Sequence, residues 1–167
     1  CRNYNRFPRQ AAAAGVHILR QAYALNPNSS HVLYASGWVH IYVGDLATAI
    51  DHFNRSLRIN PLDPMIGQIR SGLGAALVLS GRVKESVAAL EQALHEAPEF
   101  TESWLGLAIG YWELGRADEA RRFGQKLLSR EPGMTVSKHL RDSPLTIPEM
   151  LGKMERGLRG ASIGQHT

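Results

Sequence analysis

Prolines recur along this chain at a nearly constant spacing. Pro27 and Pro61 stand 34 residues apart, as do Pro98 and Pro132, and the interval between Pro61 and Pro98 is 37 residues. A period of this length is typical of helical repeats, in which each unit is a pair of helices that stacks on the next pair. Such arrays use extended concave surfaces for binding. The spacing therefore favours a binding module over a catalyst.

Small residues keep a fixed place within each unit. The glycines Gly44, Gly81 and Gly115 fall where a tight turn between antiparallel helices needs a positive φ. Two further positions, one in each helix of the unit, are small throughout: Gly37, Gly74 and Ala108 in the first, and Gly15, Ala49, Ser86 and Ala120 in the second. Because helices approach closely only where side chains are small, the pattern predicts tightly packed helix pairs.

The third unit has the most detailed pattern, built from Trp104, Leu107, Ala108, Tyr111, Gly115, Ala120 and Pro132. It resembles the tetratricopeptide repeat (TPR) family. The earlier units match less closely, since Leu33 and Arg70 replace the tryptophan, and His40 and Leu77 replace the tyrosine. The resemblance implies an all-α fold over about residues 9–134, a right-handed superhelical solenoid of antiparallel helix pairs with a C-terminal capping helix.

The repeat divides the chain into five segments. Residues 1–29 match only the second helix of a unit, residues 30–63, 64–100 and 101–134 are full units, and residues 135–167 form a helical cap with a frayed tail. We expect helices over residues 9–25, 30–43, 46–59, 64–80, 83–96, 101–114, 117–130, 135–141 and 147–159. A chain that opens on half a unit is interpreted as a fragment of a longer polypeptide.

Specific residues are expected to begin the first helix of each unit. Asp63 as N-cap, with Pro64 in the first turn, explains the three extra residues of the second unit. Ser30 and Thr101 are the N-caps expected for the other two first helices.

The resemblance also implies a concave groove lined by the first helix of each unit. Carried over position by position, the groove residues are His31, Tyr34, Trp38, Ile41, Tyr42, Gln68, Ser71, Ala75, Val78, Glu102, Leu105, Ile109 and Trp112. This set is aromatic and aliphatic, so we expect hydrophobic anchors on the partner and no lysine-rich clamp for carboxylates. The alternative is that the aromatic residues pack against neighbouring repeats or the terminal helix.

An amphipathic helix is expected near the C-terminus. Residues 146–149 have the form of a capping box, and Met150, Leu151, Met154 and Leu158 then fall on one side of a helix. This helix either covers the exposed end of the third unit or lies in the groove. Residues 160–167 are expected to fray.

The same region carries a second resemblance. Residues 132–137, 148–150 and 157–161 are similar to the end of TPR regions attached to bacterial class III adenylate/guanylate cyclases and to some winged-helix transcriptional regulators. Ser162 departs from that pattern, which has a glycine after the alanine. Gly37 and Trp38 are similar to the repeats of that group, which have a tryptophan shortly before the first glycine turn.

Residues that could carry chemistry show no suitable arrangement. The seven histidines lack paired metal-ligand spacing, and no serine or cysteine stands in a nucleophile context. We therefore expect no active site, cofactor or metal in this chain; the catalytic domain of a cyclase parent would lie outside it. A single cysteine, and no run of about 18 apolar residues, favour a cytoplasmic location and no membrane insertion.

The sequence thus predicts a non-catalytic protein–protein interaction and regulatory module of a bacterial signalling protein. Its expected partner is a protein or peptide with hydrophobic anchors, or an attached domain of the same protein. A winged-helix regulator and a small-molecule sensory domain are the alternatives. Residues 61–115 carry a net charge of −4 between two segments of +4, which leaves a head-to-tail homodimer open. Nucleic-acid binding is not expected, because basic residues on the last repeat helix alternate with acidic ones.

Overall fold

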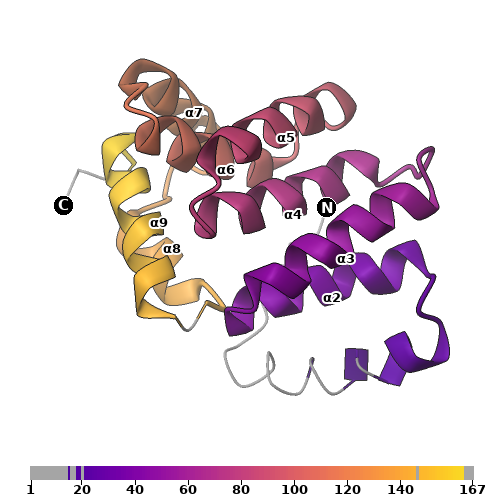
Figure 1. The fold of residues 1–167 in the computed structure, drawn as a ribbon. Helices are drawn as coiled ribbons and strands as arrows, with labels where there is room; N and C mark the ends of the chain where they lie inside the picture. The colour runs from indigo at the N-terminus through magenta and orange to yellow at the C-terminus, as the bar shows by residue number, and fades with distance from the viewer. Residues whose placement is uncertain (1–14, 16–17, 20, 146, 164–167) are drawn as a thin grey trace.

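The structure is a computed structural model that describes residues 15, 18, 19, 21–145 and 147–163. Residues 21–25 are helical. They are followed by α2 (Ser30–Val43), α3 (Leu46–Ile59), α4 (Ile66–Leu79), α5 (Val83–Glu96), α6 (Thr101–Glu113), α7 (Ala117–Arg130), α8 (Val136–Asp142) and α9 (Pro148–Gly160). The helices stack pair upon pair, and α8 and α9 lie at one side of the stack (Figure 1). The predicted all-α solenoid is confirmed.

The turn inside each helix pair is made by a glycine in the left-handed region. Gly44, Gly81 and Gly115 have φ values of 86°, 87° and 74°. At the first turn, the Gly44 amide donates to the Ile41 carbonyl, and the Asp45 amide donates to the His40 carbonyl at 2.9 Å. These bonds satisfy the last carbonyls of α2 and reverse the chain. The predicted role of the three glycines is confirmed.

Small residues inside the helices make room for large buried side chains. A Cβ added at Gly37 would lie 2.6 Å from the ring of Phe53, and one added at Gly74 would collide with Leu90. Phe53 and Leu90 are fully buried. A larger residue at either glycine would therefore displace the core side chain of the facing helix.

The TPR pattern residues of the third unit form its core. Trp104 is 5% exposed, and its indole N–H donates to the Pro98 carbonyl at 3.0 Å. The rings of Tyr111 and Phe123 are stacked with centroids 5.8 Å apart. The Tyr111 hydroxyl also donates to the carboxylate of Glu91. The aromatic and small residues of the pattern thus pack α5, α6 and α7 together.

Two of the expected N-caps are shifted by one residue. The N-cap of α2 is Ser29, whose hydroxyl accepts from the Val32 amide at 3.4 Å, and Ser30 is the first helical residue. Likewise Thr101 is the first residue of α6, after the N-cap Phe100. The prediction of Ser30 and Thr101 as caps was wrong because side-chain type alone does not distinguish an N-cap from its neighbour.

Asp63 stabilises the loop that precedes α4 and does not act as the N-cap of that helix. The second unit begins α4 at Ile66, so the early start expected at Pro64 is wrong. The Asp63 carboxylate accepts from the Met65 amide at 2.9 Å and from the Ser30 hydroxyl at 3.0 Å. Asp63 is 3% exposed. These bonds join the turn before α4 to the start of α2, which explains the extra length of this unit.

The end of the chain is packed further than expected. Ala161 and Ile163 are 1% and 0% exposed, so residues 160–163 are not frayed. A Cβ added at Gly124 of α7 would collide with Ala161, which shows how closely the two segments approach. Thr146 of the expected capping box, most of the expected helix 9–25 and residues 164–167 lie outside the described residues.

Candidate binding groove

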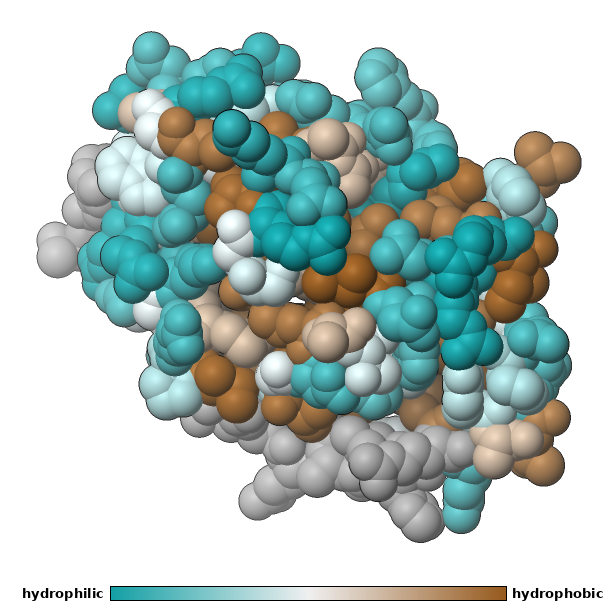
Figure 2. All heavy atoms as spheres, in the orientation of Figure 1, coloured by the Kyte–Doolittle hydropathy of each residue, from teal (hydrophilic) through white to brown (hydrophobic). Residues whose placement is uncertain are grey.

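The first helices of the three units line one wall of a cavity of about 370 Å³. Eight of the thirteen predicted groove residues line it: Trp38, Ile41, Tyr42, Ala75, Val78, Glu102, Leu105 and Ile109. They come from α2, α4 and α6, whose sequence registers place these positions on one face. In the space-filling view, hydrophobic side chains gather in the middle of the face shown and hydrophilic ones cover most of its margin (Figure 2).

The other five predicted residues do not line this cavity. His31 and Tyr34 border a small separate depression beside Ser30 and Asp63. Ser71 is fully buried and Gln68 is half-buried in α4. Trp112 packs against α9, because a Cβ added at Gly160 would collide with its ring. These five residues lie outside the cavity, and their role in partner binding remains a prediction.

The second wall comes from the described residues 134–145 and 147–163, called here the C-terminal segment, of which residues between 134 and 145 and Met154 line the cavity. Met134, Leu145 and Met154 contribute apolar side chains to the cavity, and Lys138, His139 and Asp142 of α8 contribute polar ones. The sequence analysis did not assign these residues to the groove. The apolar face predicted for α9, which includes Met154, was the available signal, but a helical pattern does not say which surface the helix covers.

The C-terminal segment contacts all three units. On the third unit, a Cβ added at Gly157 would lie 2.9 Å from the Cα of Ile109. On the second, the Lys153 ammonium donates to the carbonyls of Val78 and Leu79 at 3.2 and 3.4 Å. On the first, Ile147 packs against Gly44. The terminal helix therefore packs on the third unit, and its Met154 borders the groove.

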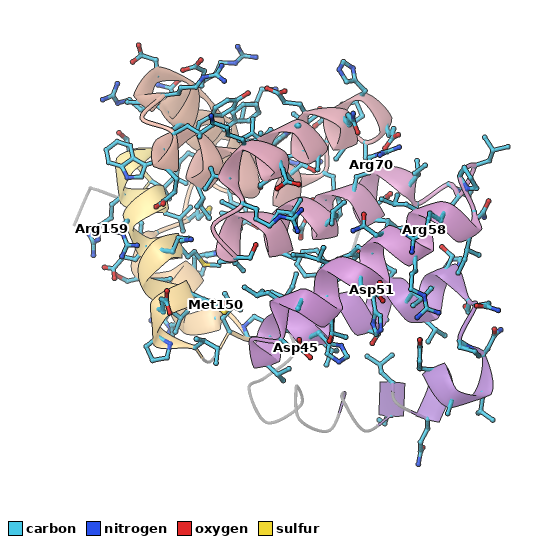
Figure 3. The ribbon with its side chains drawn as sticks, viewed as in Figure 1. Asp45, Asp51, Arg58, Arg70, Met150 and Arg159 are labelled. Carbon is cyan, nitrogen blue, oxygen red and sulfur yellow. The ribbon has the colours of Figure 1, made fainter. Side chains whose placement is uncertain are left out.

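The orientation of α9 follows from its amphipathic sequence. Met150 is 6% exposed and lies on the side facing the repeats, whereas the exposed Arg159 points outward (Figure 3). Arg159 forms an i,i+4 ion pair with Glu155, with nitrogen and oxygen 2.8 Å apart. Lys153 is the exception on the inner side, and its charge meets the negative end of the α4 dipole.

Burial and one carboxylate shape the electrostatics of the groove. Burial raises the pKa of Tyr42, and the neighbouring Tyr34 and the negative charge of Glu102 raise it further. On the facing wall, burial lowers the pKa of His139 against a weaker opposing effect of Glu131 and Asp142. The groove thus combines the neutral Tyr42 phenol and a neutral imidazole at pH 7 with the Glu102 carboxylate.

In the part of the chain that the structure describes, no three histidine, cysteine, aspartate or glutamate side chains gather as metal ligands. His40 and His52 share the Ser36 hydroxyl, with Nδ1 atoms 3.2 and 3.0 Å from its oxygen. The two imidazoles thus pack around one buried hydroxyl. Among the described helices, none has the length and apolar character needed to cross a bilayer.

The fold and groove define a helical-repeat interaction protein, and comparison with known proteins agrees. Tetratricopeptide repeat family models match residues 30–61 and 77–134, together more than half of the chain. The chain therefore belongs to the tetratricopeptide repeat family.

Individual relatives share the repeats. Over 126 residues the chain is 29% identical to the peroxisomal targeting signal receptor of Saccharomyces cerevisiae, covering 73% of this chain and 20% of the receptor. The solved structure of PilW, a type IV pilus biogenesis factor, matches 91% of this chain and 74% of its own at a TM-score of 0.65 and 18% identity. The structure of YrrB, described as a TPR protein with an unusual peptide-binding site, matches 92% of this chain and 79% of its own. The TM-score is 0.57 and the sequence identity is 17%. The chain spans a fifth or less of the curated relatives it matches.

Proposed function

We propose that this chain is a non-catalytic interaction module that binds a protein segment through hydrophobic anchors in its groove. The observation that carries the proposal is the apolar cavity of about 370 Å³ along the first helices of all three units. Trp38 and Tyr42 border it with ring centroids 6.1 Å apart, and both are residue types that contribute strongly to binding energy.

The family supports a partner of this kind. The yeast relative is named as a receptor for a targeting signal, and YrrB is described as having a peptide-binding site. An extended peptide or an amphipathic helix with apolar side chains matches the chemistry of this groove. A partner longer than the cavity would have to displace part of the C-terminal segment, since Met134, Leu145 and Met154 lie on its second wall.

The origin of the module is a finer part of the proposal. The C-terminal motif resembles TPR regions of bacterial adenylate/guanylate cyclases, so the partner could be an attached domain of the same polypeptide. Support for this comes from the sequence alone, in residues 132–137, 148–150 and 157–161. Deleting the TPR region from the full-length protein would then change nucleotide-cyclising activity. Unchanged activity and regulation would count against an attached cyclase while leaving peptide binding in the groove intact.

Selection from a peptide library tests the binding proposal. Peptides selected on this chain should share an apolar anchor and bind with a measurable affinity by fluorescence anisotropy. Leu105→Asp, which places a charge on the cavity wall, should weaken their binding by at least about tenfold. The matched control is Leu62→Asp, because Leu62 is 91% exposed and lies outside the cavity.

Helicity and melting temperature of both variants must stay near the parent values for the comparison to count. Equal peptide affinity for Leu105→Asp and the parent chain would exclude the cavity as the binding site. Selected peptides without apolar anchors would contradict the proposed chemistry.

A further inference from the structure

The terminal helix α9 crosses the first helices of the three units in order. Ile147, directly before it, packs against Gly44 at the end of α2. Lys153, near its middle, bonds to the last carbonyls of α4. Gly157, in its last turn, lies against Ile109 of α6. A helix of 13 residues is about 20 Å long, which matches two spacings of about 8–10 Å between packed helices. α9 therefore spans all three units (Figure 1).

The surface under α9 belongs to the predicted groove. The Lys153 ammonium donates to the carbonyl of Val78, a residue that also lines the cavity. Ile109, which Gly157 contacts, lines the cavity as well. A Cβ added at Gly160 would collide with the ring of Trp112, another residue assigned to the groove from the sequence. The cavity is therefore the part of the groove that α9 leaves unfilled.

The buried residues of α9 follow a simple pattern. Met150, Met154 and Leu158, spaced four residues apart, are 6%, 7% and 0% exposed. Positions i, i+4 and i+8 share one face of a helix. Lys153 adds a cation beside this face, where it meets the negative end of the α4 dipole. Gly157 allows the close approach to α6. The groove thus accepts an amphipathic helix with a lysine at i+3 and a glycine at i+7.

The helical conformation of α9 depends on this packing. A helix of 13 residues is marginal in water without tertiary contacts. Gly152 weakens it further, because glycine disfavours a helix relative to alanine. The packing does not require this glycine, since a Cβ there would meet the end of the Arg156 side chain at an ordinary 3.5 Å. The covalent connection of α9 to the repeats supplies an effective concentration on the order of millimolar. A helix held in this way exchanges with a competing helix of the same pattern.

We propose that α9 is an autoinhibitory occupant of the groove, and that the partner is an amphipathic helix with the side-chain pattern of α9. The partner helix takes the place of α9 across the three units, and its larger apolar side chains extend into the cavity. The observed affinity is then the intrinsic affinity multiplied by the fraction of chains in which α9 is released. This regulation rests on the proposed capture of a protein segment in the groove, but its first test needs no selected peptide.

A fluorescein-labelled peptide with the sequence of residues 147–163 tests the exchange on the full chain by fluorescence anisotropy. Gly157→Ala in the chain should increase the affinity for this peptide at least about fivefold, because the resident helix then clashes with α6 and is released more often. Gly152→Ala is the matched control on the same helix. It should leave the affinity unchanged or lower it, since alanine strengthens the resident helix without a clash. The same Gly157→Ala change in the peptide should weaken its binding at least about fivefold.

Amide hydrogen exchange of the parent chain is a second measurement, and it needs no variant. The slowest amides of residues 148–160 should exchange at least about tenfold faster than the slowest amides of α4 and α6, because α9 is released locally. Equal exchange of α9 and the repeat helices would overturn the proposal. Equal peptide affinity of the Gly157→Ala and parent chains, or absence of saturable binding to the Gly157→Ala chain, would also overturn it.

Library-selected peptides then separate this regulation from the proposed function. They should share the apolar and lysine spacing of α9 and bind the Gly157→Ala chain more tightly than the parent chain. Equal affinity for the two chains would overturn autoinhibition and still support binding in the groove. Failure to select any peptide would contradict the proposed function, whereas the exchange of the α9 peptide is measured independently of that selection.

Discussion

Gly157 of α9 lies directly against Ile109 of α6, with room for no more than a hydrogen atom between the two backbones. A Cβ at Gly157 would come within 2.9 Å of the Cα, Cγ1 and Cγ2 atoms of Ile109. Ile109 is 3% exposed and lines the groove. This contact sets how closely the C-terminal segment approaches the first helix of the third unit, and it closes the cavity on that side.

The first prediction concerns this contact. Gly157→Ala should destabilise the chain by about 1–3 kcal/mol, because the new methyl group meets the α6 backbone. Urea unfolding measures the change, and faster amide exchange within residues 148–160 would show that it acts through α9.

Gly152→Ala is the matched control on the same helix. Its Cβ would meet only the end of the Arg156 side chain at 3.5 Å. It should therefore leave the free energy of unfolding unchanged or raise it by up to about 1 kcal/mol, since alanine favours a helix more than glycine does. Equal destabilisation by the two substitutions would contradict the close packing of α9 on α6.

The second prediction separates two tryptophans of α6. Trp104→Ala should cost about 3–5 kcal/mol of stability because its side chain is buried and its N–H is bonded to the Pro98 carbonyl. Trp112 is 37% exposed and touches α9, so Trp112→Ala should cost less and loosen α9 alone. Urea unfolding and amide exchange distinguish the two. A loss of less than about 1 kcal/mol for Trp104→Ala would show that the repeat positions are assigned to the wrong residues.

The third prediction is a loss of stability in acid. His52 is 8% exposed, and its burial, with the nearby His40, lowers its pKa in the folded chain. Unfolded His52 therefore binds a proton at higher pH than folded His52 does. The free energy of unfolding should fall as the pH drops below about 6.5 and through the lowered pKa.

Urea unfolding at pH 7.5 and pH 5.0 measures this effect. The groups around His52 are Ser36 and His40 from α2, Tyr23 stacked on its ring, and Asp45, Asp51 and Arg55 nearby. His52→Gln should reduce the loss between the two pH values, and His95→Gln, at an exposed position, should not. His139 adds to the loss in both variants because its pKa is also lowered. An identical pH dependence in His52→Gln and the parent chain would contradict the burial of a neutral imidazole.

The fourth prediction concerns the bond between α9 and α4. Lys153→Met should lower stability by about 0.5–1.5 kcal/mol, since it removes the cation that bonds the carbonyls of Val78 and Leu79. The same substitution at the exposed Lys84 is the control. Thermal unfolding monitored by circular dichroism compares the two, and indistinguishable melting temperatures would exclude the bond.

Local rules predicted the elements that depend on neighbours in sequence. Gly44 ends α2 with a positive φ because that turn requires it, and Gly37 faces Phe53 across the same helix pair. Both follow from the repeat spacing. Trp104 and Tyr111, which belong to the pattern of the third unit, are likewise buried in the core.

Features that depend on distant partners were missed. Asp63 has the sequence context of an N-cap, yet its carboxylate bonds to Ser30, which is 33 residues away. Ile163 follows a glycine-rich stretch without a helical pattern, and it is buried by contacts between segments. Trp112 was assigned to the groove by its position in α6, but α9 packs over it. The pattern of neighbouring residues in the sequence does not predict these contacts.

The relation between the C-terminal segment and the groove can be measured directly in solution. Nuclear Overhauser effects between the Hα protons of Gly157 and the side-chain protons of Ile109 report on the contact that closes the cavity. We predict strong effects, together with helical chemical shifts throughout residues 148–160. Absence of these effects, with random-coil shifts for the same residues, would show an open groove without a second wall and contradict the two-walled cavity.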